Sequence, residues 1–507
     1  MTIRRRALVA GTVALPFLRI PARAAGTPGQ LVFGLSSYPP NFNPWVQAGT
    51  AAGTVTLQAH RGLMSYGPDG QLRGELAEKW ARDGDAGWMF TLRDASFHNG
   101  AKVTSADVKY SIEQVSAPKS TAYMRAQFQG VDRIETLDPR TVRIVMKQPT
   151  ETLPLWLAAF EMAVVAAGSA DTGKTPIGCG PFTITKQERG VSIDLAANPN
   201  FYKPGMPKLK TLRFVVYADE TARVAALQTG DVDLIEYVPW QSMAGIEADP
   251  KLRLQNTEGP FMYLTFNGAT GPFKDPKVRL AVAHAIKRDE IVKSVFYGRG
   301  AALAGTPLVE ASPFYDKTLA DGWAYDPAHA KALLAEAGLG GGFNCTLLAT
   351  AQYSMHKDTA EIVQQNLAAI GIQVELALPD WATRVSLGNR GQYQFAVNGT
   401  TADSNDPDGL SALIDSTLGP SAARSFDLGD GSIAKALAAG RAEFDPTKRA
   451  AIYTDLQKLV LAQTPIVSLA WRAQGYAMAA AVKGFTNMPG ALTFFSGTTL
   501  EETTLGG

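Results

Sequence analysis

Residues 168–175 read GSADTGKT, which fits G-x-x-x-x-G-K-[ST], the pattern of a loop that cradles nucleotide phosphates. Such a loop needs a strand before it and a helix directly after it, because N–H groups at the helix start bind the phosphate. The residues that follow are PIGCGP: Pro181 would remove a hydrogen bond of that helix, and Gly178 and Gly180 weaken it. The stretch FVVYADE, residues 214–220, resembles the acidic strand of an ATPase. Such a strand acts together with a phosphate-binding loop, which this sequence lacks. We therefore predict a Gly/Pro turn after residue 175 and no nucleotide site.

Other catalytic patterns are missing from the sequence. None of the five histidines stands at an H-x-x-x-H spacing, which leaves a zinc site unsupported, and no G-x-S-x-G nucleophile turn occurs. Acidic pairs are common, but spacing alone does not place two carboxylates across one groove as a glycosidase needs. We predict a protein that is not an enzyme and that holds no cofactor or metal.

One short acidic segment is ADSNDPDG, residues 402–409. Asp406, Asp408 and Gly409 stand at some offsets of a calcium loop, but Ser404 is at the first position and the terminal glutamate is missing. The plain interpretation is a turn rich in Asp and Asn.

Charge and composition describe an exported globular protein. The chain has 507 residues, 46% hydrophobic and 19% charged, which suits two or three lobes. Five of its 48 Lys and Arg lie in the first 24 residues, so the rest carries a formal charge of −4, which argues against a nucleic-acid partner. Three arginines, the apolar stretch ALVAGTVALPFL and the ARA site at 22–24 form a signal peptide, with a twin-arginine or a plain secretory signal both open. We expect a soluble periplasmic protein without a lipid anchor.

The two cysteines, Cys179 and Cys345, are far apart in the sequence. An oxidising compartment permits a disulfide between them, but the distance between their Cα atoms decides it. We expect two separate buried thiols.

Helix starts and strand-like runs alternate along the chain. Asp275-Pro276, Asp326-Pro327 and Asp445-Pro446 each offer an N-cap acid followed by proline at the first helical position. Thr104-x-x-Asp107 resembles a capping box. A helix that stops at Gly371 and enters IQVEL is half of a βαβ unit, which predicts an α/β fold with parallel strands in the second half.

A series of long segments resembles one known family, the family 5 bacterial solute-binding proteins, which are the dipeptide and oligopeptide receptors of ABC importers. The matching segments, in chain order, are GELAEKW (74–80), WMFTLRDASFHNGAKVTSADVKYSIE (88–113), PIGCGPF (176–182), TARVAALQTGDVDL (221–234), PFKDPKVRLAVAHAIKRDEI (272–291), YDPAHAKALLAEAG (325–338), NLAAIGIQVEL (366–376) and QTPIVSL (463–469). They cover nearly the whole mature chain. By this resemblance, GKTPIGCGPF is an inter-lobe turn rather than a phosphate loop.

The resemblance implies a two-lobed periplasmic-binding-protein fold of type II character, with mixed sheets, an extra inserted subdomain and a hinge between the lobes. After the signal peptide at 1–24, lobe I would comprise 25–266 and 483–507, with the subdomain at about 56–174. Lobe II would comprise 267–482, and hinge strands would cross near Thr265–Gly268 and Ala477–Val482. The monomeric receptor would capture a dipeptide or oligopeptide between the lobes and deliver it to a membrane permease driven by ATPase subunits.

The resemblance also implies ligand contacts. Asp403 matches the aspartate that binds the α-ammonium of a peptide, with Asp406 as its competitor. Trp381 matches a tryptophan that lines a side-chain pocket, against the alternative of a core aromatic. Ser37 and Tyr38, at the end of the first strand, match the place where the first lobe pairs its backbone with the peptide.

Two positions depart from the oligopeptide receptors. Thr400 replaces a tryptophan, and Val397 replaces an arginine that some members use for a peptide carboxylate. These differences leave open a receptor of the same class for an opine, an oligosaccharide, a metal chelate or haem. A secreted hydrolase or a periplasmic chaperone is the alternative of a different class.

Overall fold

The computed structural model describes residues 29–46, 49–172, 175–310 and 312–506. The expected signal peptide, residues 1–24, lies outside the described residues. Within the described parts of the chain, no helix combines the length and the apolar character needed to cross a membrane.

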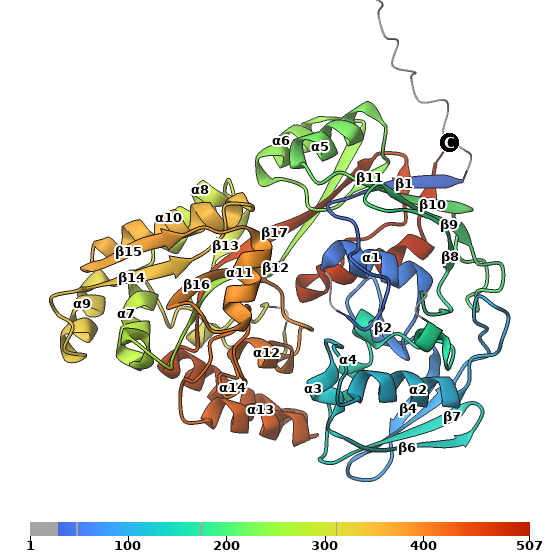
Figure 1. Ribbon diagram of the computed structural model, residues 1–507, viewed down its shortest axis with the longest axis horizontal. Helices are drawn as coiled ribbons and strands as arrows, with labels where there is room; N and C mark the ends of the chain where they lie inside the picture. The colour runs from blue at the N-terminus through green and yellow to red at the C-terminus, as the bar shows by residue number, and fades with distance from the viewer. Residues whose placement is uncertain (1–28, 47–48, 173–174, 311, 507) are drawn as a thin grey trace, which may run out of the picture.

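One large mixed sheet extends from β15 at one side of the molecule to β8 at the other (Figure 1). Its strand order is β15-β14-β16-β12-β17-β11-β1-β10-β9-β8, and β13 also pairs with β17. The bounds are β1 (Gln30–Leu35), β8 (Phe182–Glu188), β9 (Ser192–Ala197), β10 (Thr211–Val216), β11 (Leu234–Ile235), β12 (Leu252–Phe266), β13 (Gly300–Ala302), β14 (Phe343–Leu348), β15 (Ile372–Ala377), β16 (Phe395–Thr400) and β17 (Ile466–Ala479).

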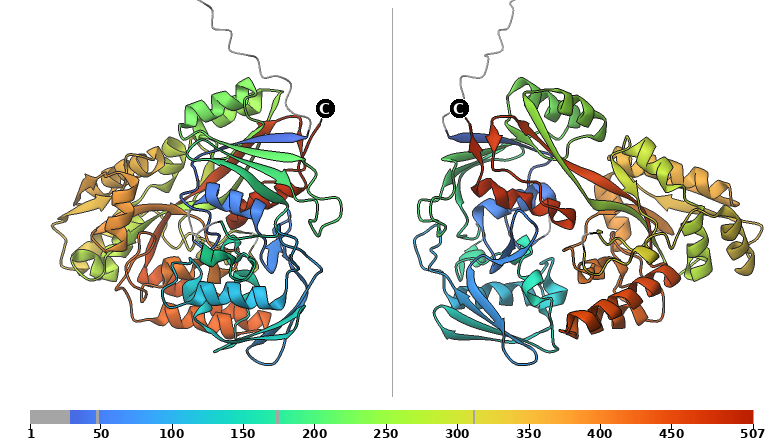
Figure 2. Two further views of the ribbon diagram at one scale, coloured as in Figure 1. Left: turned by 45° about the vertical axis from the view of Figure 1, so that its right-hand side comes forward. Right: turned by 180° about the vertical axis from the view of Figure 1, so that it is seen from behind.

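The two longest strands, β12 and β17, form an antiparallel ribbon that joins two hydrophobic cores. Phe261 and Leu264 of β12 belong to the core that includes β14–β16, which we call lobe II. At the other end of the ribbon, Tyr476 and Met478 of β17 belong to a core with β1 and β10, which is part of lobe I. The two-lobed α/β fold predicted from the sequence is therefore confirmed, and Figure 2 shows the ribbon passing from one lobe to the other.

Along the ribbon, the packing changes from one core to the other between the two predicted hinge segments. Thr265 pairs with Ile466 at the end of β12 inside lobe II, and Ala477 already packs in lobe I. The two strands pass from the core of lobe II to that of lobe I between these points, around Glu258–Phe261 and Trp471–Gln474. The register of the β12–β17 pairing shifts there. The expected residue limits of the lobes stay a prediction.

A smaller sheet in the order β4-β5-β7-β6 lies between β1 and β8 in the sequence and has a core of its own, built on Phe90, Ile112 and Ile144. We assign it to lobe I as an inserted subdomain. The bounds of this sheet and of two hairpin-like pairs are β2 (Met64–Tyr66), β3 (Leu72–Gly74), β4 (Ala77–Arg82), β5 (Gly87–Leu92), β6 (Val131–Asp138), β7 (Thr141–Met146), β18 (Val482–Lys483) and β19 (Thr504–Leu505).

The predicted helix caps are confirmed. Asp275, Asp326 and Asp445 each accept hydrogen bonds from backbone N–H groups of the following turn, and Thr104 and Asp107 form a capping box. The α-helices are α1 (Thr50–Ala59), α2 (Ser105–Ser116), α3 (Arg125–Phe128), α4 (Leu153–Trp156), α5 (Glu220–Thr229), α6 (Trp240–Ala248), α7 (Pro276–Ala285), α8 (Arg288–Val295), α9 (Pro327–Glu336), α10 (Ser354–Ala368), α11 (Trp381–Asn389), α12 (Ser411–Ile414), α13 (Ser432–Ala442) and α14 (Pro446–Gln463). The 3₁₀ helices are η1 (Phe160–Met162), η2 (Ser169–Thr172), η3 (Pro272–Lys274), η4 (Lys317–Leu319), η5 (Pro407–Leu410) and η6 (Gly490–Glu501).

The predicted βαβ unit is also confirmed. Strand β14, helix α10 and strand β15 follow one another, and β14 and β15 pair in parallel from Phe343–Ile372 to Leu348–Ala377. Gly371, between α10 and β15, has φ +93°, a value that favours glycine.

The Gly/Pro turn after residue 175 has no helix, as predicted, and leads directly into β8. A Cβ atom on Gly178 would lie 2.1 Å from the carbonyl oxygen of Ala59, and one on Gly180 would lie 2.3 Å from that of Gln58. These glycines therefore let the turn pack against the end of α1. Because α1 and β8 both belong to lobe I, the turn joins the inserted subdomain to that lobe and does not lie between the two lobes.

Cys179 and Cys345 are separate buried thiols, as expected. Burial raises the pKa of each to about 12. Both side chains therefore pack as small apolar groups at neutral pH.

Candidate functional site

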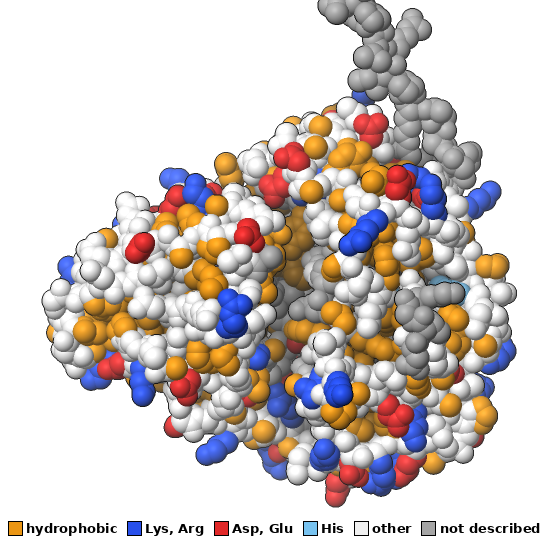
Figure 3. Space-filling model, viewed as in Figure 1, with side chains coloured by type: hydrophobic (Ala, Val, Ile, Leu, Met, Phe, Trp, Pro, Cys, Tyr) orange, Lys and Arg blue, Asp and Glu red, His pale blue; other side chains and the backbone are white. Residues whose placement is uncertain are grey.

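A cavity of about 1350 Å³ lies between the lobes. Its walls come from the end of β1, the start of α1, the inserted subdomain, the starts of α6, α10 and α11, the segment after β16, and the middle of β17. Figure 3 shows the molecule hollowed between the two lobes on the face seen in Figure 1. The volume lies somewhat above the ~300–1000 Å³ typical of pockets for small ligands.

Asp403 lines this cavity in the segment that follows β16. Its backbone N–H donates to the carbonyl oxygen of Gly409 at 3.1 Å, which closes the local turn. Its carboxylate Oδ1 accepts a 2.7 Å hydrogen bond from the hydroxyl of Tyr123, which belongs to the inserted subdomain. Burial raises the pKa of Asp403 to about 6, partly offset by the hydrogen bond from Tyr123. This carboxylate therefore stands in a cavity wall where both lobes meet, and a cation there would favour its charged form.

Asp406 lies outside the cavity lining and already has a partner. Its two carboxylate oxygens accept hydrogen bonds of 2.7 and 2.9 Å from Arg449, and both side chains are 9% exposed. Asp406 also caps η5 by accepting from the N–H of Asp408. Its contacts are those of a structural ion pair, and Asp403 is the one of the two aspartates that lines the cavity.

The two residues expected at the end of the first strand differ in position. Ser37 lines the cavity, together with Ser36, whose hydroxyl donates to Glu236 at 2.7 Å. Tyr38 does not line it and packs edge-on against Phe42 with ring centroids 6.0 Å apart. Ser37 is thus in place for a ligand contact and Tyr38 is not.

Trp381 lines the cavity from the first position of α11. Its ring stands edge-on to Tyr353 at 5.2 Å and to His356 at 5.5 Å, and Arg384 lies over it at 5.3 Å. Burial is the main cause that lowers the pKa of His356, to about 3, so this imidazole is neutral at pH 7. The group forms an aromatic, largely uncharged wall.

Contacts between the lobes surround the cavity. Besides the Tyr123–Asp403 bond, the indole N–H of Trp156 donates to Asp408 at 2.9 Å. The backbone N–H of Glu151 donates to the carbonyl oxygen of Arg441 at 2.7 Å. These bonds link the inserted subdomain to lobe II, so the structure is that of a closed cleft.

Sequence reasoning missed three polar cavity residues. Glu161, on η1, is 3% exposed, and burial, with the nearby charge of Asp403, raises its pKa to about 8. Arg472 and Gln474, in the middle of β17, are each 1% exposed. No local motif marks any of them, because their burial depends on the packing of segments distant in sequence. Alternation along WRAQGY is the one signal that places Arg472 and Gln474 on a common face.

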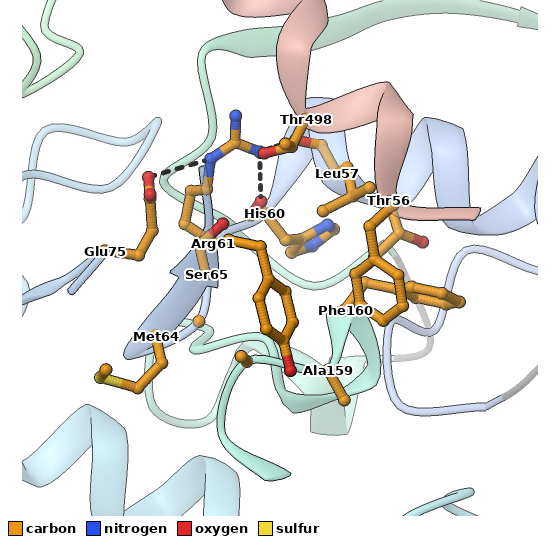
Figure 4. A pocket seen from close by; sticks show the side chains of 14 residues that line it. Thr56, Leu57, His60, Arg61, Met64, Ser65, Glu75, Ala159, Phe160 and Thr498 are labelled. Atoms are coloured by element: carbon orange, nitrogen blue, oxygen red, sulfur yellow. Dashed lines mark hydrogen bonds and ion pairs between the residues drawn. The ribbon is translucent and has the colours of Figure 1, made fainter. Parts of the chain in front are cut away.

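A second, smaller pocket lies inside lobe I around Arg61 (Figure 4). Arg61 binds Glu75 at 3.1 Å and Glu501 at 2.8 Å, and Lys203 contacts both carboxylates. The pocket measures about 20 Å³, room for about one water molecule. We interpret it as a structural ion-pair cluster. In the described residues, no group of three or more His, Cys, Asp or Glu has the geometry of a metal site.

Comparisons with known proteins agree with this architecture. Residues 71–421 match the sequence profile of the bacterial extracellular solute-binding proteins, family 5 middle. The glutathione-binding protein GsiB of Pectobacterium atrosepticum is 27% identical over 99% of both chains. The structure of the binding protein AgaA from A. tumefacien R10 in complex with agropinic acid is 40% identical, covers 94% of this chain and 99% of its own, and has a TM-score of 0.88.

A peptide-bound neighbour shares the fold. The structure of DppA from Helicobacter pylori in complex with the peptide STSA is 23% identical, covers 94% of this chain and 98% of its own, and has a TM-score of 0.83. The family profile spans well over half of the chain, and the fold and central cavity agree with it. The chain belongs to the family 5 bacterial extracellular solute-binding proteins, the substrate-binding receptors of ABC importers.

Proposed function

We propose that this receptor works in the periplasm and captures a small carboxylic acid derived from an amino acid, of the opine class. The observation that carries the solute class is the 40% identity, over nearly the full length, to a protein bound to agropinic acid. Peptide receptors of known structure resemble this chain at 22–23% identity, which supports the shared fold alone.

The cavity suits a polar solute. It combines the carboxyl groups of Asp403 and Glu161, the second of which is protonated at pH 7, with a buried cation and an amide (Arg472 and Gln474) and with the aromatic wall at Trp381. A few placed polar groups within an otherwise apolar pocket fix the orientation of a small ligand.

Capture follows from contacts with both lobes. A solute that touches Asp403 on one side and the inserted subdomain on the other binds the closed state more tightly than the open one. Its binding energy therefore shifts the population towards the closed state, through a hinge motion at the β12–β17 ribbon. The closed receptor then presents the solute to the permease, and ATPase subunits drive transport.

A short peptide is the second candidate, and Asp403 favours it. Its carboxylate lines the cavity with the Tyr123 hydroxyl as its hydrogen-bond donor, so it has acceptor capacity left for a peptide ammonium group. Relatives named as glutathione-binding proteins, 27% identical over nearly the full chain, point the same way.

Calorimetric titration of the exported protein with agropinic acid, mannopinic acid, glutathione, Met-Leu and STSA tests the proposal. We expect one of the opine acids to bind most tightly and to raise the melting temperature by mass action. Tight binding of a peptide with no binding of either opine acid would overturn the opine class and favour the second candidate. Failure of every solute to bind would overturn both.

A further inference from the structure

Arg472 and Gln474 lie two positions apart on β17 and both line the interlobe cavity. Side chains at i and i+2 of a strand point to the same face, so the guanidinium and the amide project together. Each residue is 1% exposed. They therefore form one buried polar surface on the strand that joins the two lobes.

The hydrogen-bonding capacity of this pair is largely unused in the described structure. A nitrogen of the Arg472 guanidinium donates to the thioether sulfur of Met355 at 3.1 Å, and a thioether is a weak acceptor. Nε of Arg472 has no partner, and neither do Oε1 and Nε2 of Gln474. Among the described residues, Arg472 forms no ion pair within 4.0 Å.

Other buried arginines of this protein donate to several oxygen acceptors, although Nη2 of Arg288 and Nε of Arg384 have no partner. Arg288, for example, donates to the carbonyl oxygens of Leu303, Ser468 and Trp323, at 2.8, 2.9 and 2.7 Å. A buried charge is normally paired, because its removal from water is costly. Arg472 departs from that rule at a cavity wall, where a solute can supply the missing acceptor.

The backbone holds this pair firmly in position. The β12–β17 register shifts between Glu258 and Phe261, directly opposite Arg472, and β13 pairs with the other edge of β17 at this residue. The amide of Asn487 donates to the carbonyl oxygen of Gln474 at 2.9 Å. The two side chains therefore project from a strand that is held by hydrogen bonds, rather than from a loop.

We infer that Arg472 and Gln474 form the subsite for a carboxylate of the solute, with the guanidinium donating to the carboxylate oxygens and the Gln474 amide binding a neighbouring carbonyl or hydroxyl group. A planar guanidinium matches a carboxylate with two parallel hydrogen bonds. The Tyr237 ring, whose centroid lies 6.0 Å from the Arg472 guanidinium carbon, forms the adjoining wall. This subsite deepens the proposed function and rests on it.

The test compares an acid with its neutral amide. Agropinic acid and its carboxamide are titrated calorimetrically into wild-type protein, R472M, R472K and Q474M. We expect the wild type to prefer the acid at least 10-fold. R472M loses that preference, with about 100-fold weaker binding of the acid and little change for the amide. R472K and Q474M each weaken binding of the acid about 10-fold. Wild-type affinity of R472M for the acid would overturn the subsite.

A second comparison separates this inference from the choice of solute. If the wild type binds STSA and not the opine acid, the proposed solute class fails, and the same titration with STSA and its C-terminal amide tests Arg472.

The ligand-free proteins give a readout that needs no solute. We expect R472M to melt no lower than the wild type, because the Arg472 guanidinium has only a thioether as its acceptor, whereas the control R288M loses hydrogen bonds to three carbonyl oxygens and melts lower. A loss of melting temperature in R472M as large as that in R288M would mean that the guanidinium is already satisfied, and would overturn the inference.

Discussion

Glu161 should make the ligand-free receptor less stable as the pH rises. Its carboxyl is 3% exposed, and burial raises its pKa from 4.5 to about 8. The folded state therefore keeps a proton that the unfolded state releases above about pH 4.5. By linkage, the free energy of unfolding is highest below pH 4.5, falls as the pH rises, and levels off above about pH 8.

The size of this effect follows from the two pKa values. One group that titrates at 4.5 when unfolded and at about 8 when folded lowers the free energy of unfolding by about 3 kcal/mol between pH 5 and pH 7.5. Glu161→Gln removes the titration with little change in shape. We therefore expect E161Q to be more stable than the wild type at pH 7.5 and to lose most of this pH dependence.

Urea denaturation of the ligand-free protein at steps between pH 5 and pH 8 measures the effect. The exposed Glu375 supplies a matched control, since E375Q should keep the wild-type pH profile. Asp403 acts in the same direction but at lower pH, between about 4 and 6, because burial raises its pKa to about 6. An E161Q protein whose stability still falls by about 3 kcal/mol from pH 5 to pH 7.5 would refute the assignment of this titration to Glu161.

Two further substitutions separate a ligand contact from a structural ion pair. Asp403→Asn should weaken the binding of free-amine ligands ~10- to 100-fold, because it removes a charge-assisted hydrogen bond, and should leave N-acetylated ligands nearly unchanged. Equal losses for both ligand types in calorimetry would remove Asp403 from this role. Arg449→Met should lower the free energy of unfolding by ~3–5 kcal/mol, because it leaves Asp406 buried without its partner. The double variant D406N/R449M should recover part of that loss in urea denaturation, and no recovery would show that the pair is not the cause.

Much of the fold could be predicted because its signals are local. The caps at Asp275, Asp326 and Asp445 depend on residues one to three positions away, and the stop at Gly371 depends on one backbone angle. The absence of a helix after residue 175 was predictable for the same reason, since proline and glycine act on their own turn. The register shift opposite Arg472 could not be predicted, because it depends on packing between β12, β17 and β13.

The site was predicted only where a family motif marked it. Asp403, Trp381 and Ser37 line the cavity, whereas Asp406, in the same acidic segment, is bound to Arg449. Which of two nearby aspartates lines the cavity depends on a partner 43 positions away, which the segment itself does not specify. Some oligopeptide receptors have an arginine at the position that Val397 occupies in this chain, and no arginine close to it in sequence takes its place. Arg472 was overlooked because it lies on a different strand.

Small-angle scattering across a calorimetric titration tests the central claim, that a solute is enclosed between two lobes, most directly. The ribbon of β12 and β17 and the closed-cleft contacts, such as Tyr123 with Asp403, predict that the radius of gyration decreases in step with saturation by the solute that the titration identifies. A scattering profile that stays unchanged while the same sample binds that solute to saturation would contradict the account.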